Sequence, residues 1–255
     1  MTASTRTPDA TSAARHITAH FDEFAPDYDV TAFGGAGMAR LSRIDLDNVR
    51  RAAALATGTD TAGGADTRRR ACDVGVGTGR ISRELVRLGF DLVGVDASTG
   101  MLAEASRVLA GADLRVGSLA ERLPVDDGSA DLVTCLRVVK YLPEWPAAIA
   151  ELARVARPGG IVCFDLANSR SVARFGYPEG MVWPADHRDA TLAIAAAGLE
   201  LVELRPGVHL PDPLWRAAGS AAAAAVVGAG EAALATVLGR HGARSWTFIT
   251  RKRPV

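Results

Sequence analysis

Apolar and polar residues alternate along the middle of the chain in a pattern that predicts strands and helices in turn. Short apolar runs are typical of buried strands, and helical segments repeat their apolar residues every three to four positions. The strand-like runs are 71–74, 92–95, 114–117, 132–136 and 161–166. The helix-like segments between them are 80–88, 99–109 and 146–156. Strand–helix alternation at this spacing predicts a doubly wound, parallel sheet.

The two ends of the chain add further elements to this core. Helical spacing recurs in 16–24, 38–56 and 189–197. Further strand patterns follow at 199–204 and 246–250. We therefore expect a single α/β domain over residues 16–255, with a seven-stranded, mostly parallel, Rossmann-like sheet. Residues 1–15 are polar, which predicts a disordered tail.

The predicted sheet does not supply a wall on the side where a substrate would bind. We expect residues 16–56 to form a helical cover and residues 168–240 to form lid segments on that side. Both regions contain aromatic residues next to glycine, at 33–35 and 175–178. Water exclusion from a reaction site requires such a cover, and moving lids commonly provide it.

One apolar segment, 217–239, is long enough to span a bilayer. It consists mostly of Ala and Gly and carries Glu231, which favours two soluble helices with a break near Gly228 and Gly230. The N-terminal residues contain no apolar run of the kind found in export signals. We therefore expect a cytoplasmic protein that has no membrane partner.

The composition excludes several other classes of function. The 255 residues carry a formal net charge of zero, so no global field recruits nucleic acid, and we expect no nucleic-acid partner. Cys72, Cys135 and Cys163 each lie singly inside an apolar run. This spacing predicts buried, reduced thiols and neither a disulfide nor a zinc site. Whether the protein is a monomer or a homodimer stays open.

A glycine-rich loop between the first strand and the next helix is the strongest chemical signal. It contains Gly75, Gly77 and Gly79. Glycines let backbone N–H groups approach a ligand closely, at a helix N-terminus that favours negative charge. The third glycine comes one residue earlier than in the dinucleotide fingerprint G-x-G-x-x-G, which argues against a nicotinamide enzyme. A tight turn without a ligand is the alternative.

Asp96 ends the following strand, about 20 residues beyond the loop. An acid at this position is able to accept hydrogen bonds from both hydroxyls of a ribose. Its alternative role is to cap the next helix, for which Ser98 is better placed.

Together these segments resemble the class I S-adenosylmethionine-dependent methyltransferases. The segments that carry the resemblance are 21–29, 73–79, 94–101, 123–133 and 153–160. Residues 73–79 match D-x-G-x-G-x-G, and residues 94–101 match G-x-D-x-S-x-x-M. The first segment is similar to the family's F-D-x-x-A-x-x-Y-D. The others are similar to the stretches that lead into its fourth and fifth strands.

The resemblance implies that S-adenosyl-L-methionine is the cofactor. It places near the cofactor Tyr28, Asp73, Gly75, Gly77, Gly79, Asp96, Ala97, Met101, Ser118, Leu119, Ala120 and Arg137. The glycine loop with Asp73 would hold the amino-acid end, and Asp96 would hold the ribose. The adenine would lie beside Ala97, Met101 and the segment 118–120, where many relatives carry an Asp that this chain lacks. Tyr28 and Arg137 would contact the methionine carboxylate or the substrate.

The reaction that the resemblance implies is methyl transfer to oxygen or nitrogen of a small organic molecule, such as a specialised natural product. A general base is needed only for a weakly acidic hydroxyl or a protonated amine, and the candidates are Lys140, Tyr141, His187 and His209. Metal-dependent relatives carry an Asp after the fourth strand, where this chain has Arg137, so no metal is expected. A non-methylating reaction on the same fold, such as cyclisation, and a non-catalytic ligand-binding role remain as alternatives.

Overall fold

The computed structural model describes residues 10–58, 68–171, 173 and 181–254. Its α-helices are α1 (Ala10–Phe24), α2 (Tyr28–Phe33), α3 (Gly35–Thr57), α4 (Arg80–Arg87), α5 (Thr99–Val108), α6 (Trp145–Val155), α7 (His187–Ala196), α8 (Asp212–Ala217) and α9 (Ala221–Leu238). Its strands are β1 (Arg70–Val74), β2 (Asp91–Asp96), β3 (Asp113–Val116), β4 (Ala130–Cys135), β5 (Ala156–Ala167), β6 (Leu199–Pro206) and β7 (Ser245–Lys252). Short 3₁₀ turns are η1 (Ala25–Asp27), η2 (Val139–Tyr141) and η4 (Gly239–Gly242).

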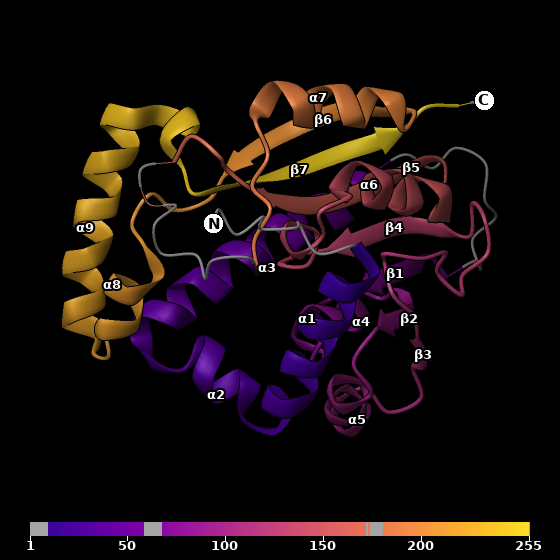
Figure 1. The fold of residues 1–255 in the computed structure, drawn as a ribbon, viewed down its shortest axis with the longest axis horizontal. Coiled ribbons are helices and arrows are strands. Elements are labelled where there is room, and N and C mark those ends of the chain that lie inside the picture. The colour runs from indigo at the N-terminus through magenta and orange to yellow at the C-terminus, as the bar shows by residue number, and fades with distance from the viewer. Residues whose placement is uncertain (1–9, 59–67, 172, 174–180, 255) are drawn as a thin grey trace, which may run out of the picture.

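The strands form one seven-stranded sheet in the order β3-β2-β1-β4-β5-β7-β6 (Figure 1). The pairs from β3 to β5 are parallel, and β7 runs antiparallel to both β5 and β6. This confirms the predicted fold class. The chain direction across the sheet reverses between β1 and β4, and ligands of such sheets bind at the carboxyl ends of the strands at this reversal.

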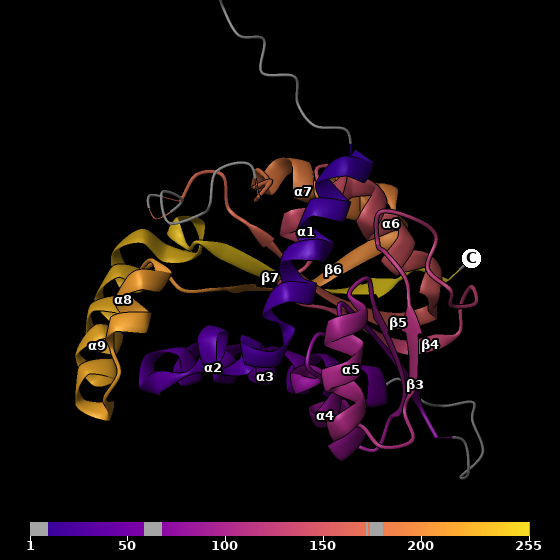
Figure 2. The ribbon, with the colours of Figure 1, turned by 60° about the horizontal axis from the view of Figure 1, so that its bottom comes forward.

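Helices cover both faces of the sheet. Apolar residues of α3, α4 and α5 pack on one face, including Val49, Leu85 and Ala105. Those of α6 and α7 pack on the other face, including Ile149 and Ile194. Helix α1 lies across the carboxyl edge of the sheet, and α8 and α9 stand together at the end of the molecule beside α3 (Figure 2).

The N-terminal region differs from the sequence prediction in two ways. Helix α1 begins at Ala10, so residues 10–15 are helical and not part of a disordered tail; residues 1–9 lie outside the described part. Helix α3 does not serve only as a cover, because Val49, Ala52 and Ala53 in its second half pack into the core of the sheet. The cover over the strand ends is therefore formed by α1 and α2.

The predicted break in the Ala-rich segment is wrong. Helix α9 runs without interruption through Gly228 and Gly230, and the break falls before Ser220, whose side chain accepts a hydrogen bond from Ala223 N. A glycine costs an Ala-rich helix only about 1 kcal/mol, which the long helix tolerates. Gly228 leaves room for Arg40, because an added Cβ would lie 3.3 Å from the Arg40 Cζ atom. By length and composition, Ala221–Gly242 qualifies as a candidate membrane span, and little of it is buried.

The three thiols lie where the sequence predicted. Cys72 in β1, Cys135 in β4 and Cys163 in β5 are buried and free. Strand β5 is longer than predicted, because it begins at Ala156, directly after α6, and includes residues 158–160.

Candidate functional site

The glycine-rich loop turns sharply between β1 and α4. Gly75, Gly77 and Gly79 all have left-handed backbone angles, with φ of 74°, 55° and 86°. The nitrogens of Gly75 and Val76 donate hydrogen bonds to Val95 O at 2.7 and 3.0 Å, which fixes the loop to the end of β2. A Cβ at Gly75 would lie 2.1 Å from Cγ2 of Val138. Only glycine fits there.

Asp96 connects this loop to the next helix. Its Oδ2 accepts a hydrogen bond from Gly77 N at 2.8 Å, and its Oδ1 accepts one from Ser98 N at 2.9 Å. Burial raises the pKa of Asp96, and the backbone N–H groups of Ser98 and Gly77 act in the opposite direction. Ser98 caps α5, since its hydroxyl accepts from Met101 N at 3.0 Å. Asp96 is thus free of the capping role.

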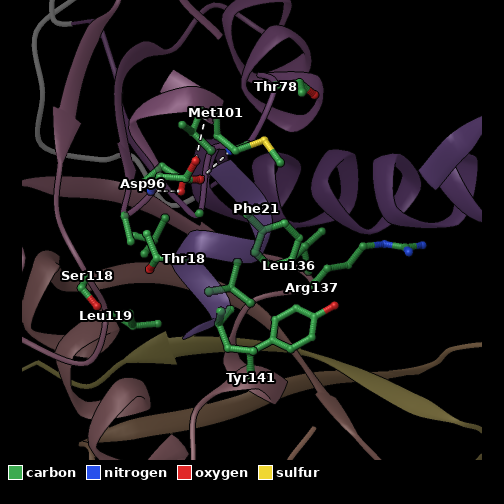
Figure 3. Close-up of a pocket in the computed structure, with 18 of the residues that line it drawn as sticks. Thr18, Phe21, Thr78, Asp96, Met101, Ser118, Leu119, Leu136, Arg137 and Tyr141 are labelled. Atoms are coloured by element: carbon green, nitrogen blue, oxygen red, sulfur yellow. Dashed lines mark hydrogen bonds between the residues drawn. The ribbon is translucent and has the colours of Figure 1, made fainter. Parts of the chain in front are cut away.

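A cavity of about 140 Å³ opens beside the loop and Asp96 (Figure 3). The residues that the sequence assigned to the site and that line this cavity are Tyr28, Gly75, Gly77, Asp96, Ala97, Met101, Ser118, Leu119, Arg137 and Tyr141. They come from α2, the loop, the turn after β2, the turn after β3 and the end of β4. The topology therefore brings most of the predicted residues to one place.

Three of the residues assigned to the cofactor do not line this cavity. Asp73 is 1% exposed, and its carboxylate accepts hydrogen bonds from Ser82 Oγ and Thr134 Oγ1, both at 2.7 Å. Asp73 therefore stabilises the loop from inside the fold, by binding α4 and β4. Gly79 lies against Val108 and Leu109 at the end of α5, where an added Cβ would be 3.0 Å from Leu109 Cδ1. Ala120 lines a neighbouring groove between α1 and the end of β3.

Helix α1, part of the helical cover expected over 16–56, contributes a wall whose individual residues the sequence analysis did not assign to the site. Ala14, Ile17, Thr18 and Phe21 line the cavity from this helix. The Phe21 ring meets the Tyr141 ring edge-on, with centroids 5.5 Å apart. Phe21 belongs to the motif noted at 21–29, but its position opposite Tyr141 depends on the tertiary fold.

A second aromatic group lies on α2. The ring of Tyr28 is edge-on to Phe21 at 5.9 Å and to Phe33 at 5.8 Å. Burial raises the pKa of Tyr28, and the nearby Tyr141 adds to this effect. Helix α2 is held to the glycine loop by Thr78 Oγ1, which donates to Asp29 Oδ1 at 2.6 Å.

Arg137 follows β4 in a strained conformation. Its φ is 64°, which is a left-handed backbone conformation. In the described part of the chain, every other residue with such a conformation is a glycine. Its Nε donates to Asp45 Oδ2 at 2.8 Å, and its guanidinium lies 5.2 Å from the centre of the Phe33 ring. The side chain extends away from the Asp96 end of the cavity (Figure 3). Arg137 thus borders the site and is paired with α3.

The two predicted histidines lie elsewhere. His187 begins α7 and packs edge-on against Trp246, with ring centroids 5.4 Å apart. His209 is 3% exposed, with Nδ1 2.8 Å from Glu231 Oε1 and Nε2 2.9 Å from Gly239 O. Neither lines the cavity, so the structure does not bring these two to the site, and Tyr141 is the candidate base that it does bring there.

None of the described residues between 168 and 240 lines this cavity. The predicted aromatic turn at 175–178 lies outside the described residues. In the described ranges, no group of three His, Cys, Asp or Glu side chains is arranged to hold a metal ion.

The cavity fits the cofactor that the sequence implies. The close approach at Gly75 exposes the backbone of the loop, and Asp96 retains lone pairs toward the cavity for a ribose diol. Met101, Ala97 and Leu119 supply apolar contacts on the Asp96 side, where a flat base would pack.

Comparison with known proteins agrees with this geometry. The profile of a family described as "Methyltransferase domain" matches residues 72–164. The demethylmenaquinone methyltransferase of Parafrankia sp. (strain EAN1pec) is 37% identical over 57% of this chain and 60% of its own length. The chain thus spans about three fifths of the length of this curated relative.

Two solved structures share the fold. The [4+2]-cyclase SpnF is 19% identical with a TM-score of 0.67, covering 95% of this chain and 97% of the other. Magnesium protoporphyrin IX methyltransferase from Synechocystis PCC 6803, solved with bound S-adenosylhomocysteine (SAH), is 17% identical with a TM-score of 0.61, covering 93% and 99%. At these identities the likeness concerns the fold alone. Residues 72–164 thus match a methyltransferase domain, and the loop–Asp96 geometry agrees with the resemblance of this part of the chain to the class I S-adenosylmethionine-dependent methyltransferases.

Proposed function

We propose that this protein transfers the methyl group of S-adenosylmethionine to an oxygen or nitrogen of a small organic acceptor. The observation that carries the proposal is one cavity with two kinds of wall. On one side are the glycine loop and Asp96. On the other are Phe21, Tyr28, Phe33 and Tyr141, which suit an apolar or aromatic acceptor.

The bound cofactor supplies an electrophilic methyl group on a sulfonium, so the protein needs mainly to align the reactants and exclude water. Asp96 would hold the ribose, and the backbone at Gly75 and Gly77 would hold the amino-acid end. Phe21 and Ile17 of α1 would keep water away from the reacting atoms. Tyr141 lies at the acceptor side, where its hydroxyl would orient the acceptor nucleophile.

The acceptor class is inferred from the cavity walls together with one relative. The Parafrankia relative is a demethylmenaquinone methyltransferase, and this name denotes a flat, largely apolar acceptor. A conjugated natural product with a hydroxyl or amino group is therefore the acceptor that we propose.

A methyl-transfer screen tests this function. Purified protein would be incubated with methyl-labelled S-adenosylmethionine and a panel of hydroxylated and aminated aromatic metabolites, with the D96A variant as control. Formation of SAH together with a labelled product by the native protein, and its loss in D96A, is the expected result. Tight binding of SAH without transfer, together with rearrangement of a panel member, would instead identify a non-methylating enzyme such as a cyclase.

A further inference from the structure

A second, polar cavity of about 60 Å³ lies next to the first. It is enclosed between α3, the carboxyl end of β5, the start of β7 and α8, and it shares Arg137 with the larger cavity. Its charged lining residues are Asp45, Arg137, Lys140, Asp165, Asp212 and Arg244. Of the residues assigned to the cofactor, Arg137 alone also lines this second cavity.

Most polar groups in the wall of this second cavity have partners within the wall. Arg137 donates to Asp45, and Arg244 pairs with Asp212. The Asn48 amide donates to Thr247 Oγ1 at 2.9 Å, and the Asn48 carbonyl oxygen accepts from Arg205. These pairs hold α3 and α8 to the end of the sheet. The side chains that form them are therefore already engaged with one another.

Asp165 is different from the other lining carboxylates. It is 9% exposed, and its Oδ1 accepts a hydrogen bond from the Arg137 backbone nitrogen. Among the residues that the structure describes, none forms an ion pair with Asp165, and none donates a hydrogen bond to its Oδ2. Burial raises the pKa of Asp165, and the charges of Lys140 and Arg137 oppose this effect by favouring the ionised form. Buried carboxylates with perturbed pKa values gather at functional sites.

The size of the polar cavity limits what it holds. By this measure of volume a water molecule occupies at least about 10–15 Å³, so 60 Å³ accommodates a few atoms and not a whole metabolite. Arg137 lines both cavities, so the two adjoin at its side chain.

We propose that the polar cavity binds a hydroxyl or amino head group of the acceptor, which donates a hydrogen bond to Oδ2 of Asp165. The body of the acceptor lies among Phe21, Tyr28 and Tyr141 in the larger cavity. An anionic head group is disfavoured at this position, because it would place a second negative charge beside Asp165. This inference rests on the proposed function and specifies the acceptor class: an aromatic molecule with a donor group at one end.

The test uses two small probes, benzylamine and benzoate, which share a ring and differ in the head group. Their binding to the native protein saturated with SAH would be measured by ligand-observed NMR. Benzylamine is expected to bind more tightly than benzoate. In D165N, which keeps the size of the side chain and removes its charge, benzylamine affinity is expected to fall at least about tenfold. D126N removes one charge from an exposed position outside the cavity and is expected to change nothing.

Calorimetry with SAH on each variant separates this inference from the proposed function. If the native protein does not bind SAH, the proposed function and the inference about Asp165 both fail. If SAH binds equally to native protein and D165N but benzylamine does not distinguish them, only the role of Asp165 is refuted. Absence of benzylamine binding to native protein, or tighter binding of benzoate, refutes it as well.

A pH series on native protein gives a second measurement in case D165N does not fold. Benzylamine stays cationic in acid, whereas Asp165 becomes protonated as the pH falls through its raised pKa, so the affinity is expected to fall with it. The other charged groups facing Asp165 are Asp45 from α3, Arg137 and Lys140 after β4, Asp212 from α8 and Arg244 before β7. Although burial acts to raise the pKa of Asp212, Arg244 lowers it. An affinity that stays constant throughout the acid range would contradict the proposal.

Discussion

Asp22 on α1 accepts a hydrogen bond at 2.5 Å from the hydroxyl of Ser98, the residue that caps α5. The same Asp22 oxygen accepts a second bond from Gly100 N at 3.0 Å. Ser98 N in turn donates to Asp96. The helix that covers the cavity is therefore attached to the turn that carries the proposed ribose ligand.

The D22A substitution should loosen this cover. Without the carboxylate, α1 loses both bonds to the start of α5, and backbone amides in residues 14–24 should exchange with solvent about fivefold faster. Hydrogen exchange followed by mass spectrometry measures this, with α6 as an internal reference. E23A removes the same charge from the next residue on the helix, which is exposed. Equal exchange in D22A and E23A would show that Asp22 does not hold the helix.

The D96A substitution should weaken binding of the cofactor product. It removes the proposed acceptor of the ribose hydroxyls and also releases Gly77 N and Ser98 N, which Asp96 now binds. The expected loss is about 2–4 kcal/mol of binding free energy for SAH, measured by calorimetry. D126N serves as the charge control. An unchanged affinity in D96A would place the cofactor elsewhere.

Local sequence signals predicted the parts of this molecule that local physics determines. The glycine-rich turn before α4 and the Ser98 cap depend on residues close together in the chain, and both were predicted from the sequence. The alternation of strands and helices likewise follows from local periodicity. The seven-stranded sheet is therefore as expected.

The parts that the sequence did not predict depend on contacts between distant residues. Asp22 and Ser98 are 76 positions apart, and Arg137 and Asp45 are 92 apart. The identity of a residue also does not tell whether its side chain is buried in the fold. His209 looked like a candidate base, but Glu231, 22 positions away, holds it inside the fold. The place of Asp165 in the polar cavity became visible only once α3 and α8 were packed beside it.

The three cysteines should resist modification in the native protein. Burial raises the pKa of Cys72 to about 12 and raises the pKa values of Cys135 and Cys163 as well. Because the thiolate is the reactive form, none should react with a disulfide reagent at neutral pH. All should react after unfolding in denaturant, which serves as the control. Fast labelling of any one thiol in folded protein would contradict the buried positions.

The two central loop glycines should respond differently to alanine. Both have positive φ, so G75A and G77A should each cost about 1–2 kcal/mol in unfolding free energy through backbone strain. G75A should cost more, because its Cβ would lie 2.1 Å from Cγ2 of Val138, whereas the nearest atom to a Cβ at Gly77 is 4.0 Å away. V138A should recover the difference in the G75A background and not in the G77A background. Equal costs in denaturant unfolding would exclude the clash.

Asp73 should make the stability of the protein depend on pH in an unusual direction. Burial raises its pKa to about 6, although Ser82 and Thr134 donate hydrogen bonds that oppose the rise. An Asp in an unfolded chain has a pKa of about 3.9. The folded protein therefore keeps this proton more strongly than the unfolded chain does, and the proton stabilises the fold.

The stabilising contribution of the proton on Asp73 is fully present below about pH 4 and is lost as the pH rises to about 6, where the folded protein also releases the proton. The loss should approach about 3 kcal/mol, since each pH unit between the two pKa values contributes about 1.4 kcal/mol. D73N does not titrate, so its unfolding free energy relative to native protein should increase across this window and stay level above it. Asp96 and Asp165 also have raised pKa values, but they are present in both proteins, and their contributions cancel in the difference. Urea unfolding of both proteins from about pH 4 to about pH 7 measures the difference, and a constant gap between them would show that Asp73 is ionised throughout and that its hydrogen bonds outweigh its burial.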